Sequence, residues 1–156
     1  MSTPPSTFVK PWMVVVALTV VAGVGASAVY FDAQAQHRRD RRDISAWEAR
    51  ALPAARDGQT MVGTLRPSMP VSQIVTIRSA LERDLVAITR SPLPEIVRPA
   101  ADLYIEAFRR SESALEAVGT ASFRTAMARA LAAFARAATA VHDLDCRARM
   151  PACASP

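Results

Sequence analysis

The stretch EIVRPAADLYIEAFRRSESALEAV (residues 95–118) decides the fold of this chain. Its apolar and small side chains recur with a period near 3.5 residues, which is the spacing of one face of an α-helix. That face consists of Ile96, Val97, Ala100, Leu103, Tyr104, Ala107, Phe108, Ser111, Ala114, Leu115 and Val118. Acidic and basic residues alternate on the opposite face. This division is typical of a helix in a bundle, and we predict one here.

The segments on either side repeat the pattern. Residues 71–90 place apolar side chains at three- and four-residue steps, and residues 120–149 do the same with many alanines, which favour helix formation. Gly119 provides a helix stop between the second and third helices. Short links favour antiparallel neighbours, so we predict an all-α fold with a small antiparallel three-helix bundle at residues 70–148.

The segment before the bundle carries different signals. Residues 52–70 contain three prolines and two glycines, which predicts a loop at residues 53–69. Residues 32–52 have no helix breaker and carry dense charges of both signs, so we predict a charged helical stalk. The end of the stalk, around Ile44 and Trp47, can add a fourth helix to the bundle.

Residues 12–31 carry no charge, and as a helix these 20 residues would span about 30 Å, the thickness of a bilayer core. Trp12 lies at one end, with Tyr30 and Phe31 at the other, where aromatic rings favour the headgroup level. We therefore predict a single transmembrane helix at residues 12–31, after a short tail at residues 1–11. Cleavage as a signal peptide, at small-residue sites near its end, is the alternative.

Two features of the anchor bear on assembly and orientation. Small residues four apart would let two membrane helices approach closely, which makes a weak candidate packing face of Ala22, Gly23, Ala26 and Ser27. A cluster of four arginines follows the span and favours a cytoplasmic bundle under the positive-inside rule: Arg38, Arg39, Arg41 and Arg42. Long domains are often translocated across the membrane regardless of the positive charges near the span, and the cysteine pair described below favours an oxidising compartment. We therefore predict an extracytoplasmic bundle.

Composition and motifs exclude several functions. The net charge is +5, but 14 acidic residues are interleaved with the 19 basic ones, and the arginines form no single-sign helix face with aromatics. We therefore expect no nucleic-acid partner. The sequence contains no phosphate-binding loop, HExxH or GxSxG motif, so we predict no enzyme activity and no cofactor, and no small-molecule substrate can be identified.

The tail VHDLDCRARMPACASP (residues 141–156) holds the only two cysteines, Cys146 and Cys153. We predict a disulfide that joins the end of the last helix to the C-terminal tail at residues 149–156. Two alternatives remain. Both thiols can be unpaired, or His142, Cys146, Met150 and Cys153 can form a soft set of ligands suited to Cu(I) or a redox site.

These features together predict a membrane-anchored, non-catalytic helical bundle of the bacterial cell envelope. It would act as an interaction or accessory module, and its partners would be the lipid bilayer and either another envelope protein or a second copy of the chain. Two alternative functions are an extracytoplasmic metal- or redox-handling protein that uses the tail cluster, and a cytoplasmic scaffold tethered to the membrane.

Overall fold

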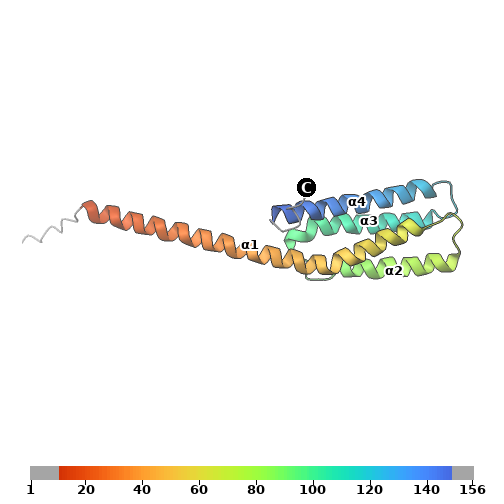
Figure 1. Cartoon of the computed structure of the whole chain (residues 1–156), viewed down its shortest axis with the longest axis horizontal. Coiled ribbons are helices and arrows are strands. Elements are labelled where there is room, and N and C mark those ends of the chain that lie inside the picture. The colour runs from red at the N-terminus through yellow and green to blue at the C-terminus, as the bar shows by residue number, and fades with distance from the viewer. Residues whose placement is uncertain (1–10, 149–156) are drawn as a thin grey trace, which may run out of the picture. The chain divides into compact units, whose positions relative to one another are not determined.

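The computed structural model describes the backbone of residues 11–148 and the side chains of residues 33–148. Its elements are helices α1 (Pro11–Thr64) and α2 (Val71–Thr89), a 3₁₀ turn η1 (Glu95–Val97), and helices α3 (Arg98–Glu116) and α4 (Phe123–Arg147) (Figure 1). No strand occurs among the described residues. The predicted all-α class is confirmed.

The bundle is larger than the sequence predicted. The chain divides into two compact units, residues 1–39 and residues 40–156. The second unit contains the end of α1 together with α2, α3 and α4. The predicted start of the bundle at residue 70 was therefore too late, because the last part of α1 is one of its four helices.

Helices α3 and α4 pack extensively against each other and lie side by side (Figure 1). Most of the face of α3 predicted from residues 95–118 is buried, but Leu103 was wrongly included, since it is 36% exposed. Helix α4 contributes a stripe of small and aromatic residues, namely Phe123, Ala130, Ala133, Phe134, Ala137 and Val141. The alanines permit close approach of the two backbones. Gly119, with φ of 82°, supplies the left-handed residue in the link between them.

The end of the predicted stalk packs into the core as the fourth helix. Ile44 and Trp47 on α1 are fully buried. The indole Nε1–H of Trp47 donates a hydrogen bond of 3.3 Å to the carbonyl of Ile88, near the C-terminal end of α2. That carbonyl lies among the last in α2, where the helix itself supplies no donor, so Trp47 satisfies a group that would otherwise be buried without a partner.

The predicted loop at residues 53–69 was wrong over most of its length, since α1 continues to Thr64. Pro53 lies inside the helix but on its exposed face, where water can bind the carbonyl that a proline cannot reach. Ala54, Ala55 and Val62 are buried on the other face. Tertiary burial of this face therefore overrides the local helix-breaking signals, and only residues 65–70 connect α1 to α2.

Gly58, also counted as a loop signal, is a packing residue. A Cβ at this position would lie 2.7 Å from Cζ and 2.9 Å from Cε1 of Phe108, and 3.3 Å from Cζ of Phe134. No side chain larger than hydrogen fits here without movement of these rings. Gly58 therefore lets α1 approach the aromatic centre of the bundle.

Four aromatic side chains form that centre. The ring centroids of Trp47 and Tyr104 are 6.3 Å apart, and those of Tyr104 and Phe134 are 6.4 Å apart. Phe108 meets Phe134 edge to face at 5.3 Å. These separations lie in the range in which aromatic pairs attract one another beyond simple burial. The chain of rings connects α1, α3 and α4.

Candidate functional site

The structure describes part of the predicted tail cluster. Cys146 Sγ and His142 Nε2 lie 3.6 Å apart across one exposed turn of α4. Among the described residues no cysteine is a free thiol. Met150 and Cys153 lie outside the described residues, so the disulfide and the four-residue soft-metal site both stay predictions. Nowhere in the described part of the chain do three or more His, Cys, Asp or Glu residues gather as a potential metal site.

The predicted anchor, residues 12–31, is helical in its backbone as part of α1, but its side chains lie outside the described residues. This applies to the interface residues Trp12, Tyr30 and Phe31 and to the small-residue face of Ala22, Gly23, Ala26 and Ser27. Across the side chains that are described, no helix is both long enough and apolar enough to cross a bilayer.

A pair of carboxyl groups lies between α1 and α4, and the sequence analysis missed it. Asp145 is buried, and one oxygen of each carboxyl, Glu48 Oε1 and Asp145 Oδ1, is buried without a hydrogen-bond partner. The pKa of Glu48 is raised from 4.5 to about 7, mainly by burial and also by the charge and hydrogen bonding of the Asp145 side chain. Such a pair favours holding a proton near neutral pH.

Each acid lies one turn from a buried apolar residue on its own helix. Glu48 follows Ile44 by four residues, and Asp145 follows Val141 by four. This spacing was the one sequence signal that could have identified them. It does not show that the two residues meet, because they are almost a hundred positions apart and only the tertiary packing brings them together.

A second buried acid lies on α2. Asp84 is 9% exposed, and its Oδ2 has no hydrogen-bond partner, while its Oδ1 lies 4.0 Å from Nε of Arg83. Burial raises the pKa of Asp84; the positive charge of Arg83 opposes that shift, and the negative charge of Asp57 on α1 adds to it. Helix α1 therefore places an acid opposite an acid on both α4 and α2.

A pocket of about 210 Å³ opens between α1, α3 and α4. The pocket lies one helical turn from the acid pair. Its lining residue Leu52 is four residues after Glu48 on α1, and its lining residue Val141 is four residues before Asp145 on α4. Its lining is mainly apolar, with three polar side chains among it: Arg56 and Gln59 from α1 and Tyr104 from α3. A mostly apolar cavity with a few convergent polar groups has the character of a small-ligand site.

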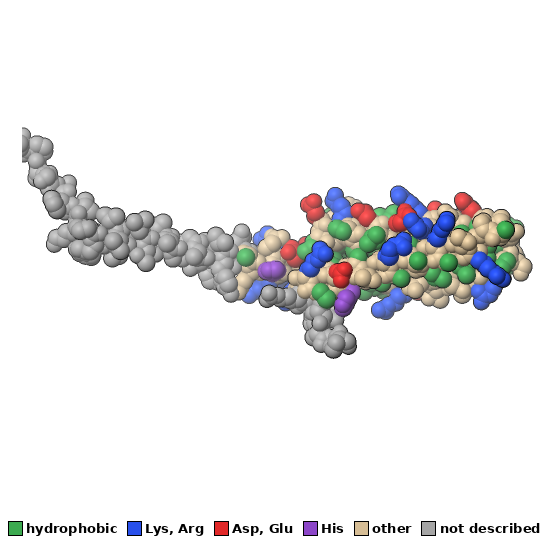
Figure 2. All heavy atoms as spheres, turned by 90° about the horizontal axis from the view of Figure 1, so that it is seen from above, with side chains coloured by type: hydrophobic (Ala, Val, Ile, Leu, Met, Phe, Trp, Pro, Cys, Tyr) green, Lys and Arg blue, Asp and Glu red, His purple; other side chains and the backbone are tan. Residues whose placement is uncertain are grey.

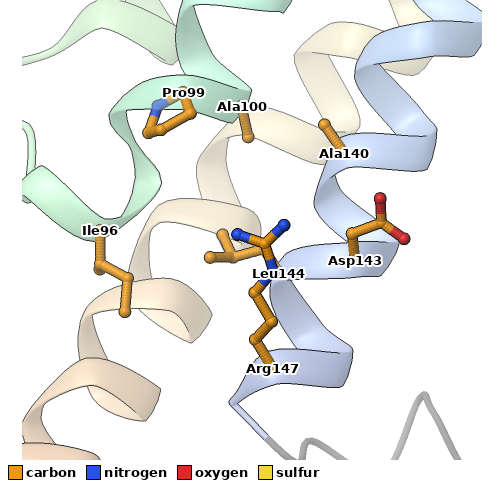
Figure 3. Close-up of a pocket in the computed structure, with 7 residues that line it drawn as sticks. All are labelled: Ile96, Pro99, Ala100, Ala140, Asp143, Leu144 and Arg147. Atoms are coloured by element: carbon orange, nitrogen blue, oxygen red, sulfur yellow. The ribbon is translucent and has the colours of Figure 1, made fainter.

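A smaller pocket of about 130 Å³ lies where η1 and the start of α3 meet the end of α4. Figure 3 shows one basic and one acidic side chain, Arg147 and Asp143, among apolar neighbours that include Ile96 and Leu144. These opposite charges leave this pocket without a net charge preference, and it is too small for more than a few non-hydrogen atoms.

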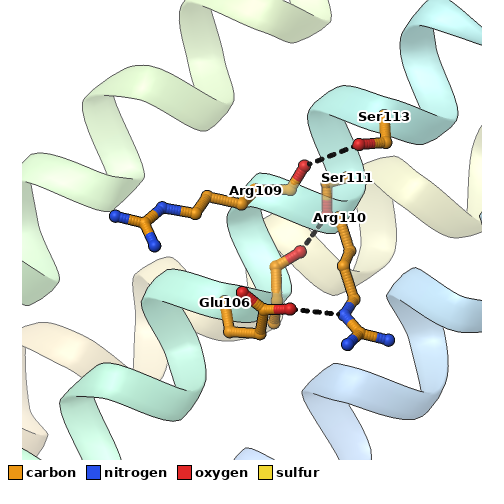
Figure 4. Close-up of polar contacts among 6 residues, drawn as sticks. Glu106, Arg109, Arg110, Ser111 and Ser113 are labelled. Carbon is orange, nitrogen blue, oxygen red and sulfur yellow. Dashed lines mark hydrogen bonds and ion pairs between the residues drawn. The ribbon is translucent and has the colours of Figure 1, made fainter.

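The outer surface carries mixed charge, as the composition indicated. Figure 2 shows basic and acidic side chains interspersed along the face of the bundle in view. The charged face of α3 is partly paired: Nε of Arg110 donates to Oε1 of Glu106 at 2.7 Å, and this hydrogen bond is the main cause that lowers the pKa of Glu106 (Figure 4). The fully buried Ser111 donates to the carbonyl of Ala107 at 2.8 Å, so no polar group is left unsatisfied there.

Comparison with known proteins adds no assignment to this geometry. The chain matches no protein-family model, no curated protein and no solved structure.

Proposed function

We propose that this chain is a single-pass membrane protein whose helical bundle serves as a non-catalytic interaction or accessory module of the bacterial cell envelope. Residues 12–31 supply the anchor, with Trp12 at one interface and Tyr30 and Phe31 at the other. The bundle lies outside the cytoplasm.

The outward face of α2 carries the interaction role. Its inward face buries Leu81 and Ile88 against the core. Its outward face leaves Val71 75% exposed, Val75 56% exposed and Val86 64% exposed. Residues 71, 75 and 86 share one side of a helix, since they are separated by four and eleven positions. Covering these side chains removes apolar surface from water, which favours contact with another helix face.

Site-specific photocrosslinking in intact cells tests this contact. A photoreactive residue at Val75 is expected to give a discrete crosslinked product, whose mass distinguishes another envelope protein from a second copy of the chain. The same residue at Ala128, which is exposed on α4, provides the matched control. Equal crosslinking at both positions, or none at Val75, contradicts a contact through α2.

The anchor and orientation need separate tests. The chain should stay in the membrane fraction after carbonate extraction, and removal of residues 12–31 should release it. A reporter fused after residue 156 should be active only outside the cytoplasm. Activity restricted to the cytoplasm would instead favour the tethered scaffold, in line with the arginines that follow the span.

The tail supports one alternative function. The 3.6 Å approach of His142 to Cys146 favours a metal- or redox-handling site if Met150 and Cys153 complete it. We propose instead that Cys146 and Cys153 form a structural disulfide. Cu(I) bound at one equivalent, and lost when both cysteines are replaced by serine, would support the alternative. A chain that remains free of metal after copper loading would rule it out.

A further inference from the structure

Tyr104 is a largely buried tyrosine that lines a pocket. Only 3% of its surface is exposed, and it lines the 210 Å³ pocket between α1, α3 and α4. Its hydroxyl is not among the side-chain atoms that are fully buried without a hydrogen-bond partner, so it is accessible from the pocket. Burial raises the pKa of Tyr104, so the phenol keeps its proton at neutral pH and can donate it in a hydrogen bond. A ligand that offers an acceptor in the pocket would satisfy this group.

Arg56 gives the pocket its charge. It is the one charged side chain in the lining, and it forms no ion pair with the described residues. Arg56 and Tyr104 both line the pocket, and the positive charge of Arg56 opposes the effect of burial on the pKa of Tyr104. A cationic donor beside a neutral one suits an anionic acceptor, and a planar guanidinium matches a carboxylate in particular.

The rest of the lining and the volume define the body of the ligand. Leu52, Phe134 and Val141 offer an apolar wall with an aromatic face. An apolar cavity of about 150 Å³ holds benzene, so the pocket here, about 210 Å³ and open to solvent, has room for an aromatic ring with a few further non-hydrogen atoms. This excludes long acyl chains and leaves compact acids.

We propose that this pocket binds a small monocarboxylate with a compact apolar body, of about the size of benzoate. The carboxylate accepts hydrogen bonds from the hydroxyl of Tyr104 and the guanidinium of Arg56. The apolar body packs against Phe134 and Val141. The site is independent of the membrane anchor and of the valine face of α2.

A fluorine NMR titration tests the proposal with the full chain in lipid nanodiscs. The measurement is made near pH 6, where Glu48 is protonated and does not repel an anion. 4-Fluorobenzoate is expected to bind saturably, with a Kd of about a millimolar or lower for a ligand of this size. 4-Fluorotoluene, which is neutral, and 4-fluorobenzylamine, which is cationic, should bind at least about tenfold more weakly.

Four variants locate the binding. Tyr104→Phe, which removes only the hydroxyl, and Arg56→Gln should each weaken 4-fluorobenzoate binding by about tenfold or more, because a hydrogen bond to a charged group is lost. Arg50→Gln, an exposed arginine on the same helix outside the pocket, should leave binding unchanged. Ala138→Leu should block the pocket from its exposed rim.

The control for the blocking variant is Ala135→Leu, which adds the same bulk to an exposed position of α4 outside the pocket. Three results would overturn the proposal. They are the absence of saturable binding, equal binding of the neutral or cationic probe, and binding of 4-fluorobenzoate that Tyr104→Phe and Ala138→Leu leave unchanged.

Discussion

The two glycines in the last part of α1 should respond in opposite ways to replacement by alanine. Gly58 lies against Phe108 and Phe134, whereas a Cβ at Gly63 would meet nothing within 4 Å. In both cases alanine gains about 1 kcal/mol from helix propensity, less near a helix end. The two substitutions therefore differ only in what surrounds the added methyl group.

The cost at Gly58 follows from the contact distances. The new Cβ would lie 2.7 Å from the Phe108 ring, while carbon atoms prefer a separation of about 3.5–4.0 Å. The ring would have to move by about 0.8 Å or more, and Phe108 is only 1% exposed and already in edge contact with Phe134. Overpacking of this kind typically costs about 1–3 kcal/mol.

We therefore expect Gly58→Ala to lower the free energy of unfolding by up to about 2 kcal/mol and Gly63→Ala to raise it by about 0.5 kcal/mol. Urea unfolding followed by far-ultraviolet circular dichroism measures both changes. Phe108→Leu should relieve the clash, so the double variant with Gly58→Ala should be more stable than the sum of the two single changes predicts. Similar shifts for the two alanine variants, or additive behaviour in the double variant, would refute the assigned packing of α1.

Three further predictions concern other parts of the bundle. The pKa of Glu48 is raised from 4.5 to about 7 in the folded chain, so the folded state binds more protons than the unfolded state between these pH values, and stability should fall as the pH rises through that window. Glu48→Gln should remove this loss of stability. With allowance for solvent screening, urea unfolding should show this variant to be more stable by about 1–2 kcal/mol near pH 8 but not near pH 4. Trp47→Phe should cost about 1–3 kcal/mol in thermal or urea unfolding, because it leaves the carbonyl of Ile88 buried without its donor; an unchanged midpoint would show that water takes over this role. Alkylation and intact mass of the chain in fresh membranes should show Cys146 and Cys153 protected until a reductant is added, and two thiols that react without reductant would contradict the disulfide.

The periodic helices could be predicted from the sequence because each segment contains its own amphipathic pattern. Residues 95–118 alternate an apolar face with a charged one, and α3 buries most of the predicted face, with Leu103 at its exposed margin. The same holds for Phe134 and its neighbours on α4. An amphipathic pattern is local, so it can be interpreted without knowledge of the rest of the fold.

Two features could not be predicted because they depend on tertiary contacts. Pro53 and Gly58 both indicate a loop when judged locally, yet the burial of Ala54 and Val62 keeps the helix intact around them. The pairing of Glu48 with an acid on α4 was equally hidden, since a single glutamate among stalk charges suggests a solvated side chain. Both features depend on contacts between residues of different helices, and the sequence of a single segment does not predict such contacts.

Nearly half of the buried hydrophobic residues are alanines, spread over α1, α3 and α4. Replacing a buried alanine by glycine removes only one methyl group and leaves a small cavity, whereas a larger side chain pushes two backbones apart. Packing in this bundle therefore restricts divergence toward larger residues, while the change to glycine costs mainly about 1 kcal/mol of helix propensity. A saturation scan of α4 should show this as an upper size limit on every inward position except Phe123, Phe134 and Val141.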